Sequence, residues 1–82
     1  MKEIRNIQEL GQFINDYERL QRISKSLQKL NKIQNLTTVQ EKRRAKLLEE
    51  AIQIAAKYEL SIKYNNDPKD YPLYLIDSEN HT

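Results

Sequence analysis

The sequence lacks the residues on which most enzyme sites and covalent cross-links depend. It contains no cysteine and no tryptophan, one glycine, and a single histidine, His81, one residue from its end. Without cysteine there is no disulfide, thiol nucleophile or cysteine-based zinc site, and with Gly11 alone a glycine-rich phosphate loop cannot be built. We therefore predict no catalytic residue, no bound cofactor and no metal site, and we expect that the protein is not an enzyme.

Long apolar runs are also missing. The most apolar stretch, residues 51–56, lies between Glu50 and Lys57 and is far shorter than the roughly 20 residues that a membrane-spanning helix needs. At the N-terminus the sequence runs directly into an amphipathic pattern, without the apolar core of a secretory signal. These absences predict a soluble protein with no membrane span and a cytoplasmic location.

The length of 82 residues predicts a single domain over 1–82, with residues 77–82 as a disordered tail. A chain this short buries only about 60% of the surface that its unfolded form exposes. Small scaffolds of this kind are usually supplemented by disulfides, a metal or a partner subunit. Because the composition excludes the first two, we expect the chain to bind another protein or to form a homo-oligomer.

The net charge is only +2, but the basic residues are concentrated in the middle of the chain. Nine lysines and arginines and one acidic residue, Glu41, lie between Arg19 and Lys46. The candidate basic surface comprises Arg19, Arg22, Lys25, Lys29, Lys32, Lys42, Arg43 and Lys46. Such a surface could neutralise nucleic-acid phosphates, so a small nucleic-acid-binding protein is the alternative function. A solvated helix face is the favoured interpretation, because no aromatic residue interleaves with these charges to stack on bases.

The first half of the chain has the apolar pattern of a helix. Apolar residues recur at steps of three and four from Ile7 to Ile33, which predicts an amphipathic helix over about 3–34. Successive steps of three between Ile14 and Ile23 rotate the apolar stripe. Either the helix therefore bends, or its two halves contact different neighbours.

A second helix is predicted over about 38–58. Thr38 and Glu41 match the capping box, in which two side chains satisfy unpaired amides at a helix start. The following residues form one broad apolar arc on a helical wheel. Because the connection between the helices is short, we predict an antiparallel helical hairpin.

After residue 58 the apolar period changes from that of a helix to that of a strand. Leu60, Ile62 and Tyr64 alternate with polar residues, as in a half-buried strand. Turn-forming residues follow, and residues 73–76 could return as a second strand. The segment of about 59–76 is therefore expected to be a short β-hairpin or, if the second helix is longer, an extended arm. The predicted fold class is mainly α.

One layer of two helices cannot cover all the apolar surface of the first helix. Its early stripe consists of Ile7, Leu10, Phe13, Ile14 and Tyr17. Its later stripe consists of Leu20, Ile23, Leu27 and Leu30. Either the C-terminal segment covers the surplus, or a partner does, since the later stripe has the 3-4-3 spacing of a coiled-coil seam. The candidate partner interface comprises Leu20, Ile23, Leu27, Leu30, Phe13 and Tyr17.

The whole chain, from MKEIRNIQELGQF through the second helix to YPLYLIDSENHT, resembles the small cytoplasmic lysis-inhibition accessory proteins, the RIII antiholins, of T-even bacteriophages. The resemblance lies in overall length and character. It implies a phage protein of the host cytoplasm that binds the cytoplasmic part of the holin and, with a periplasmic antiholin, delays lysis. Together with the missing site chemistry, it predicts a non-enzymatic protein-interaction regulator.

Overall fold

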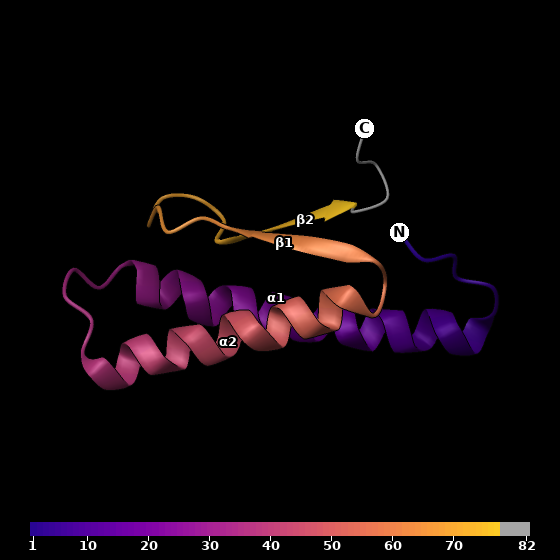
Figure 1. Cartoon of the computed structure of the whole chain (residues 1–82), viewed down its shortest axis with the longest axis horizontal. Helices are drawn as coiled ribbons and strands as arrows, with labels where there is room; N and C mark the ends of the chain where they lie inside the picture. The colour runs from indigo at the N-terminus through magenta and orange to yellow at the C-terminus, as the bar shows by residue number, and fades with distance from the viewer. Residues whose placement is uncertain (78–82) are drawn as a thin grey trace.

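The protein forms a layer of two helices with a two-stranded hairpin across one face (Figure 1). The computed structural model describes residues 1–77. The elements are α1 (Ile7–Asn31), α2 (Thr38–Ala56), β1 (Leu60–Tyr64) and β2 (Leu73–Asp77). This confirms the predicted mainly α fold with an antiparallel helical hairpin. Of the two alternatives for about 59–76, the segment forms a β-hairpin and not an extended arm.

Helix α1 is shorter than predicted at both ends. Its N-cap is Asn6, whose side chain accepts a hydrogen bond from the Glu9 amide at 2.8 Å. The preceding residues leave the helix because they run back along the molecule, where the Lys2 amide donates to the Tyr58 carbonyl at 2.8 Å. Between these ends α1 is one continuous helix. The later apolar residues of α1 are buried in the core, whereas most of the earlier ones stay exposed.

Helix α2 begins with a capping box centred one residue earlier than predicted. The Thr37 hydroxyl accepts a hydrogen bond from the Gln40 amide at 3.1 Å, and the Gln40 side chain accepts one from the Thr37 amide at 2.9 Å. The helix ends at Ala56, and Glu59 in the left-handed region (φ 59°) turns the chain into β1. This turn lays the strands back over the helices.

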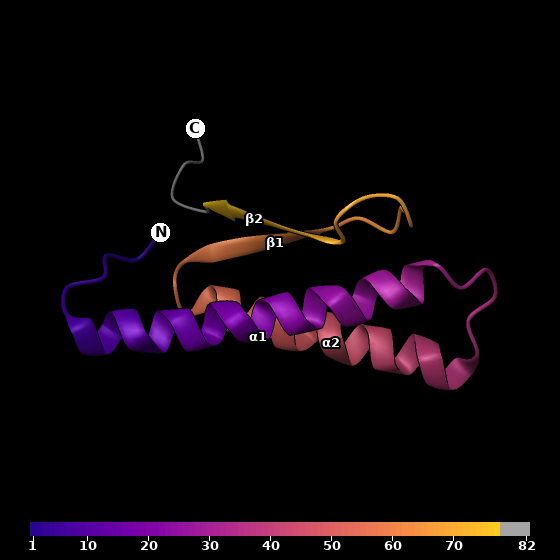
Figure 2. The ribbon, with the colours of Figure 1, turned by 180° about the vertical axis from the view of Figure 1, so that it is seen from behind.

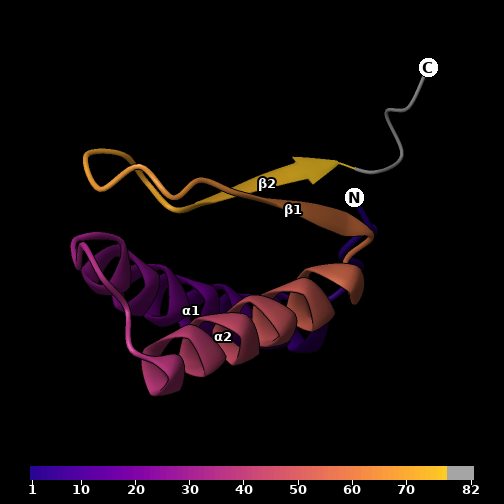
Figure 3. The same ribbon diagram turned by 60° about the vertical axis from the view of Figure 1, so that its left-hand side comes forward.

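The two strands pair antiparallel, with Ile62 opposite Leu75 and Tyr64 opposite Leu73. Because side chains alternate between the faces of a strand, these four residues share the face turned toward the helices. Figure 3 shows the hairpin lying above the helical layer along its length. The hairpin thus forms a second layer over a core that the helices begin.

The core lies between the helices and the hairpin. Its buried residues are Leu20, Ile23, Leu27 and Leu30 from α1, Ala51, Ile54 and Ala55 from α2, and Tyr58. The half-buried Leu60, Ile62, Tyr64 and Leu73 pack against it. The α2 alanines leave room for close approach of α1, and the hairpin covers the remaining side.

Polar contacts hold the hairpin at both ends. At the loop end, the Asn31 side chain donates to the Asn65 carbonyl at 3.0 Å and accepts from the Tyr64 hydroxyl. At the other end, Asp77 forms an ion pair with the amino terminus. Asp77 therefore belongs to β2, although it was predicted to begin the disordered tail. The remaining predicted tail residues, 78–82, lie outside the described residues.

Candidate functional site

The predicted partner interface falls largely in the chain's own core. Leu20, Ile23, Leu27 and Leu30 are buried against α2 and β1, so their side chains are not available to a partner. The prediction of a partner seam at these four residues is wrong, because α2 and the hairpin together cover the later stripe. Of the other two predicted residues, Phe13 is half-buried against Tyr58 and Tyr17 is exposed.

On α1, the apolar residues that stay uncovered are those of the early stripe other than Phe13. Ile7 is 88% exposed, and Leu10, Ile14 and Tyr17 are each between 44% and 47% exposed. The first turns of α1 extend beyond the end of α2 (Figure 2), so no helix lies opposite them. Isolated exposed apolar residues are ordinary on a protein surface, whereas contiguous exposed apolar patches mark interaction sites.

A groove of about 540 Å³ lies between α1 and the hairpin. We call it the hairpin groove. On the helix side it is lined by Tyr17, Leu20, Gln21, Ser24, Lys25 and Gln28. On the hairpin side it is lined by Ile62, Tyr71, Leu73, Tyr74 and Leu75. Tyr17 belongs both to the groove and to the exposed stripe, so the two apolar surfaces are continuous.

The loop between the strands positions the tyrosines of the hairpin groove. The Asp70 carboxylate accepts hydrogen bonds from the Tyr74 hydroxyl and the Tyr71 amide, both at 2.8 Å, and from the Asn65 side chain at 3.1 Å. The Asn65 amide donates to the Pro72 carbonyl at 2.8 Å and closes the loop. The groove wall is therefore built on an ordered turn.

The protonation states of Asp70 and Tyr74 at neutral pH favour the hydrogen bond between them. The hydrogen bond from Tyr74, with that from the Tyr71 amide, holds the pKa of Asp70 below its usual value. The same bond, with some burial, raises the pKa of the Tyr74 hydroxyl. Asp70 is thus a charged acceptor and Tyr74 a neutral donor, and their hydrogen bond ties the Tyr74 side chain to the loop.

Sequence reasoning missed most of the hairpin groove. Leu73 and Leu75 could have been paired with Ile62 from the alternation of the strands, which puts all three on one face. Nothing in the sequence marked Gln21, Ser24 and Gln28 as binding residues, because polar residues on a helix flank are expected to face water. They become groove lining only through the position of the hairpin.

The eight residues of the candidate basic surface are exposed, and one of them, Arg19, is held in an ion pair. Arg19 donates to both Glu50 oxygens, from Nε at 2.8 Å and from Nη2 at 2.9 Å. This contact lowers the pKa of Glu50 and raises that of Arg19. The other seven exposed residues of this surface are Arg22, Lys25, Lys29, Lys32, Lys42, Arg43 and Lys46. Five of them come from the end of α1, the connection that follows it and the start of α2, segments that meet at one end of the molecule (Figure 1).

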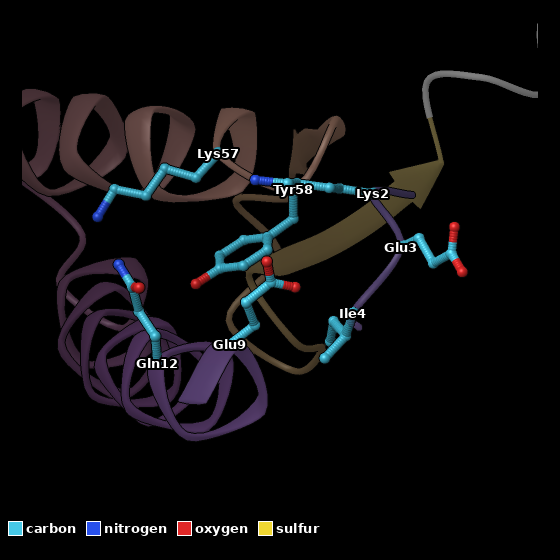
Figure 4. A pocket seen from close by; sticks show the side chains of 7 residues that line it. All are labelled: Lys2, Glu3, Ile4, Glu9, Gln12, Lys57 and Tyr58. Carbon is cyan, nitrogen blue, oxygen red and sulfur yellow. The ribbon is translucent and has the colours of Figure 1, made fainter. Parts of the chain in front are cut away.

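A second pocket of about 310 Å³ lies between the N-terminal arm and the helices (Figure 4). It is lined by Lys2, Glu3, Ile4, Glu9, Gln12, Lys57 and Tyr58. In Figure 4 the Glu3 carboxylate points away from the Tyr58 ring. Glu9 accepts a hydrogen bond from the Arg5 amide at 2.9 Å. This bond and the one from the Lys2 amide to the Tyr58 carbonyl hold the arm to both helical segments.

Tyr58 is the centre of the contacts between α1 and the end of α2. Its hydroxyl donates to the Asp16 carboxylate, which also lies 3.8 Å from Lys57 Nζ. Its ring meets Phe13 edge to face, with ring centroids 5.0 Å apart. Burial, with the bond to Asp16, raises the pKa of Tyr58 to about 12. The hydroxyl is therefore a neutral donor over the physiological range and has a structural role.

Within residues 1–77, no three His, Cys, Asp or Glu side chains are placed to hold a metal ion. Neither helix in this part of the chain is long and apolar enough to cross a membrane. Comparisons with models of protein families, with curated proteins and with solved structures find no match. The function is therefore argued from the surfaces of the molecule.

Proposed function

We propose that the protein is a non-enzymatic regulator that binds another protein through the hairpin groove. The observation that carries this proposal is the groove itself, an apolar hollow with three tyrosines at its walls, Tyr17, Tyr71 and Tyr74. Tyrosine is enriched at protein interfaces because its ring offers a large apolar area and its hydroxyl a hydrogen bond. A preformed groove of this kind suits an apolar segment of a partner.

The charges beside the groove indicate the chemistry of that segment. Lys25 lines the groove, and Lys32 shares its side of α1 on a helical wheel. Asp70, at the hairpin side, is already engaged by Tyr74 and Asn65. An apolar segment flanked by acidic residues would therefore complement the groove, with its carboxylates toward the lysines.

The resemblance to the RIII antiholins supplies a specific partner for this surface. On this proposal the bound segment belongs to the cytoplasmic part of a phage holin, and binding in the host cytoplasm delays lysis. The sequence has no nucleotide-binding loop and no cysteine. This is in keeping with a protein that acts only by binding its partner.

Binding of the purified cytoplasmic part of a T-even phage holin, measured by titration calorimetry, tests the proposal. Tyr71→Glu is expected to weaken binding by about tenfold or more, because it removes an aromatic anchor and adds a charge repelled by an acidic segment. Val39→Glu is the matched control, since Val39 is 76% exposed and Tyr71 is 71% exposed, and Val39 lies outside the groove. Equal affinities for the two variants would exclude the groove, and no binding by the wild type would exclude the holin.

A second candidate function rests on the seven exposed residues of the candidate basic surface. A nucleic-acid binder using them would retard a DNA or RNA duplex in a gel at low salt, and the retardation would fall steeply as salt rises. Replacing both Lys29 and Arg43 by glutamate would then reduce binding to every sequence alike. Absence of retardation at low salt would eliminate this function.

A further inference from the structure

The exposed stripe of α1 has the spacing of a helix-packing seam. Ile7, Leu10, Ile14 and Tyr17 are separated by three, four and three residues, which places them at successive a and d positions of a heptad. All four are exposed, and the stripe lies apart from the core residues of the same helix. Beyond Tyr17 the same heptad positions carry Gln21, Ser24 and Gln28, so the apolar seam is confined to the first half of α1.

Gly11 lies at the edge of this seam, at an e position of the heptad. A Cβ added at Gly11 would meet nothing within 4 Å, so no neighbour in the structure requires a glycine there. Glycine in a helix interior is destabilising relative to alanine. On the helical wheel Gly11 lies between Ile7 and the solvated face, 40° from Ile7. A missing side chain at that position lets another helix approach α1 closely.

We propose that a second copy of this chain packs on the stripe as an antiparallel α1 pair. The stripe is symmetric about residue 12, so reversing the second helix brings Ile7 opposite Tyr17 of the second copy and Leu10 opposite Ile14 of the second copy. Each residue then meets an apolar partner, as a two-fold interface requires. The pairing buries Tyr17, which also lines the hairpin groove, whereas the other lining residues, on the later half of α1 and on the hairpin, lie outside the stripe.

The charges on α1 favour an antiparallel pair over a parallel pair. The later half of the helix carries the exposed Lys25 and Lys29, and the exposed Lys32 is its C-cap. A parallel pair would bring these lysines of both copies side by side, with the helix dipoles aligned. In the antiparallel pair they lie at opposite ends, and Glu18 lies beside the positively polarised N-terminus of α1 of the second copy. The charge pattern is therefore complementary to a reversed copy of itself.

The size of the stripe sets the strength of the dimer. Its four side chains can bury roughly 400–500 Å² per chain, about half of the roughly 800 Å² per partner in a stable interface. We therefore expect a reversible dimer with a dissociation constant on the order of 10–100 µM. Partner binding at the hairpin groove and self-association at the stripe share Tyr17. The test substitutions do not, because Tyr71 lines only the groove and Ile14 lies only in the stripe, so either proposal can fail without the other.

Sedimentation equilibrium over a wide concentration range tests the proposal. The wild type is expected to shift from monomer to dimer, and Ile14→Glu to remain monomeric at every concentration, because two buried glutamates would face the apolar seam. Ile52→Glu is the matched control, since Ile52 on α2 is exposed to a similar extent and lies outside the stripe. A wild type that is monomeric throughout, or a dimer unaffected by Ile14→Glu, would overturn the proposal.

Cross-linking with a short bis-maleimide tests the orientation, and the chain has no cysteine of its own to interfere. In the antiparallel dimer Gly11→Cys lies next to its counterpart and is expected to cross-link. Glu18→Cys is separated from its counterpart by roughly 18 Å along the helix axis and is expected not to cross-link. The same result for the two variants, whether both cross-link or neither does, would contradict the antiparallel pair.

The same variants distinguish a membrane surface from a second copy. If the wild type stays monomeric but sediments with vesicles of anionic lipid, and Ile14→Glu does not, the stripe binds lipid and the dimer is wrong. If the wild type forms the dimer and Ile14→Glu abolishes it without vesicles, the proposal holds.

Discussion

Leu27→Ala is expected to lower the free energy of unfolding by about 2–5 kcal/mol. The Leu27 side chain is completely buried in the core between the helices and the hairpin. Truncation removes its apolar contacts and leaves a cavity that rigid helix packing closes only in part. Because small domains are marginally stable, a loss of this size would leave much of the protein unfolded at 37 °C.

Urea unfolding followed by circular dichroism measures this loss. Ile7→Ala is the control, because Ile7 is an apolar residue of the same helix but is largely exposed. Its expected change is within about 0.5 kcal/mol. Similar destabilisation by the two substitutions would mean that the core is not where the structure places it.

The second large effect is a loss of stability at high pH through Tyr58. The pKa of Tyr58 is raised to about 12 in the folded protein, above the ordinary tyrosine value of about 10. The folded state therefore holds this proton more tightly than the unfolded state, so the contribution is complete below about pH 10 and is lost as pH rises to about 12. A difference of two pKa units corresponds to roughly 3 kcal/mol.

Unfolding curves at intervals from pH 9 to pH 12 test this dependence. Tyr58→Phe keeps the buried ring but has no hydroxyl to ionise, so it is expected to lose less stability over the same interval. At neutral pH this variant is less stable by about 1 kcal/mol, because Asp16 loses a donor. Parallel pH profiles for the two proteins would show that Tyr58 does not carry the effect.

The fold was largely predictable because its signals are local. The change of apolar period after residue 58 marks the step from helix to strand, and the polar residues near Thr37 mark the start of α2. The ends of α1 were not predictable in the same way. The arm that precedes Ile7 leaves the helix to bond with Tyr58, a contact across most of the chain that has no local signature.

The candidate site was less predictable, for a physical reason. The sequence showed two apolar stripes on α1 and required that one be covered. Both stripes have residues at spacings of three and four, so the spacing does not distinguish them. The coiled-coil spacing of Leu20 to Leu30 favoured that stripe as the partner seam, and the structure buries it. Which stripe is covered depends on where α2 and the hairpin lie. The hairpin groove also exists only because the hairpin lies beside α1.

Nuclear magnetic resonance of the labelled protein titrated with the holin's cytoplasmic part tests the central claim most directly. The claim is that a partner binds in the hairpin groove, so the amide shifts are expected to change most along 17–28 of α1 and along 71–75. The exposed basic residues at the start of α2, Lys42 to Lys46, are expected to change little. Changes confined to that basic end, or changes nowhere, would contradict the account.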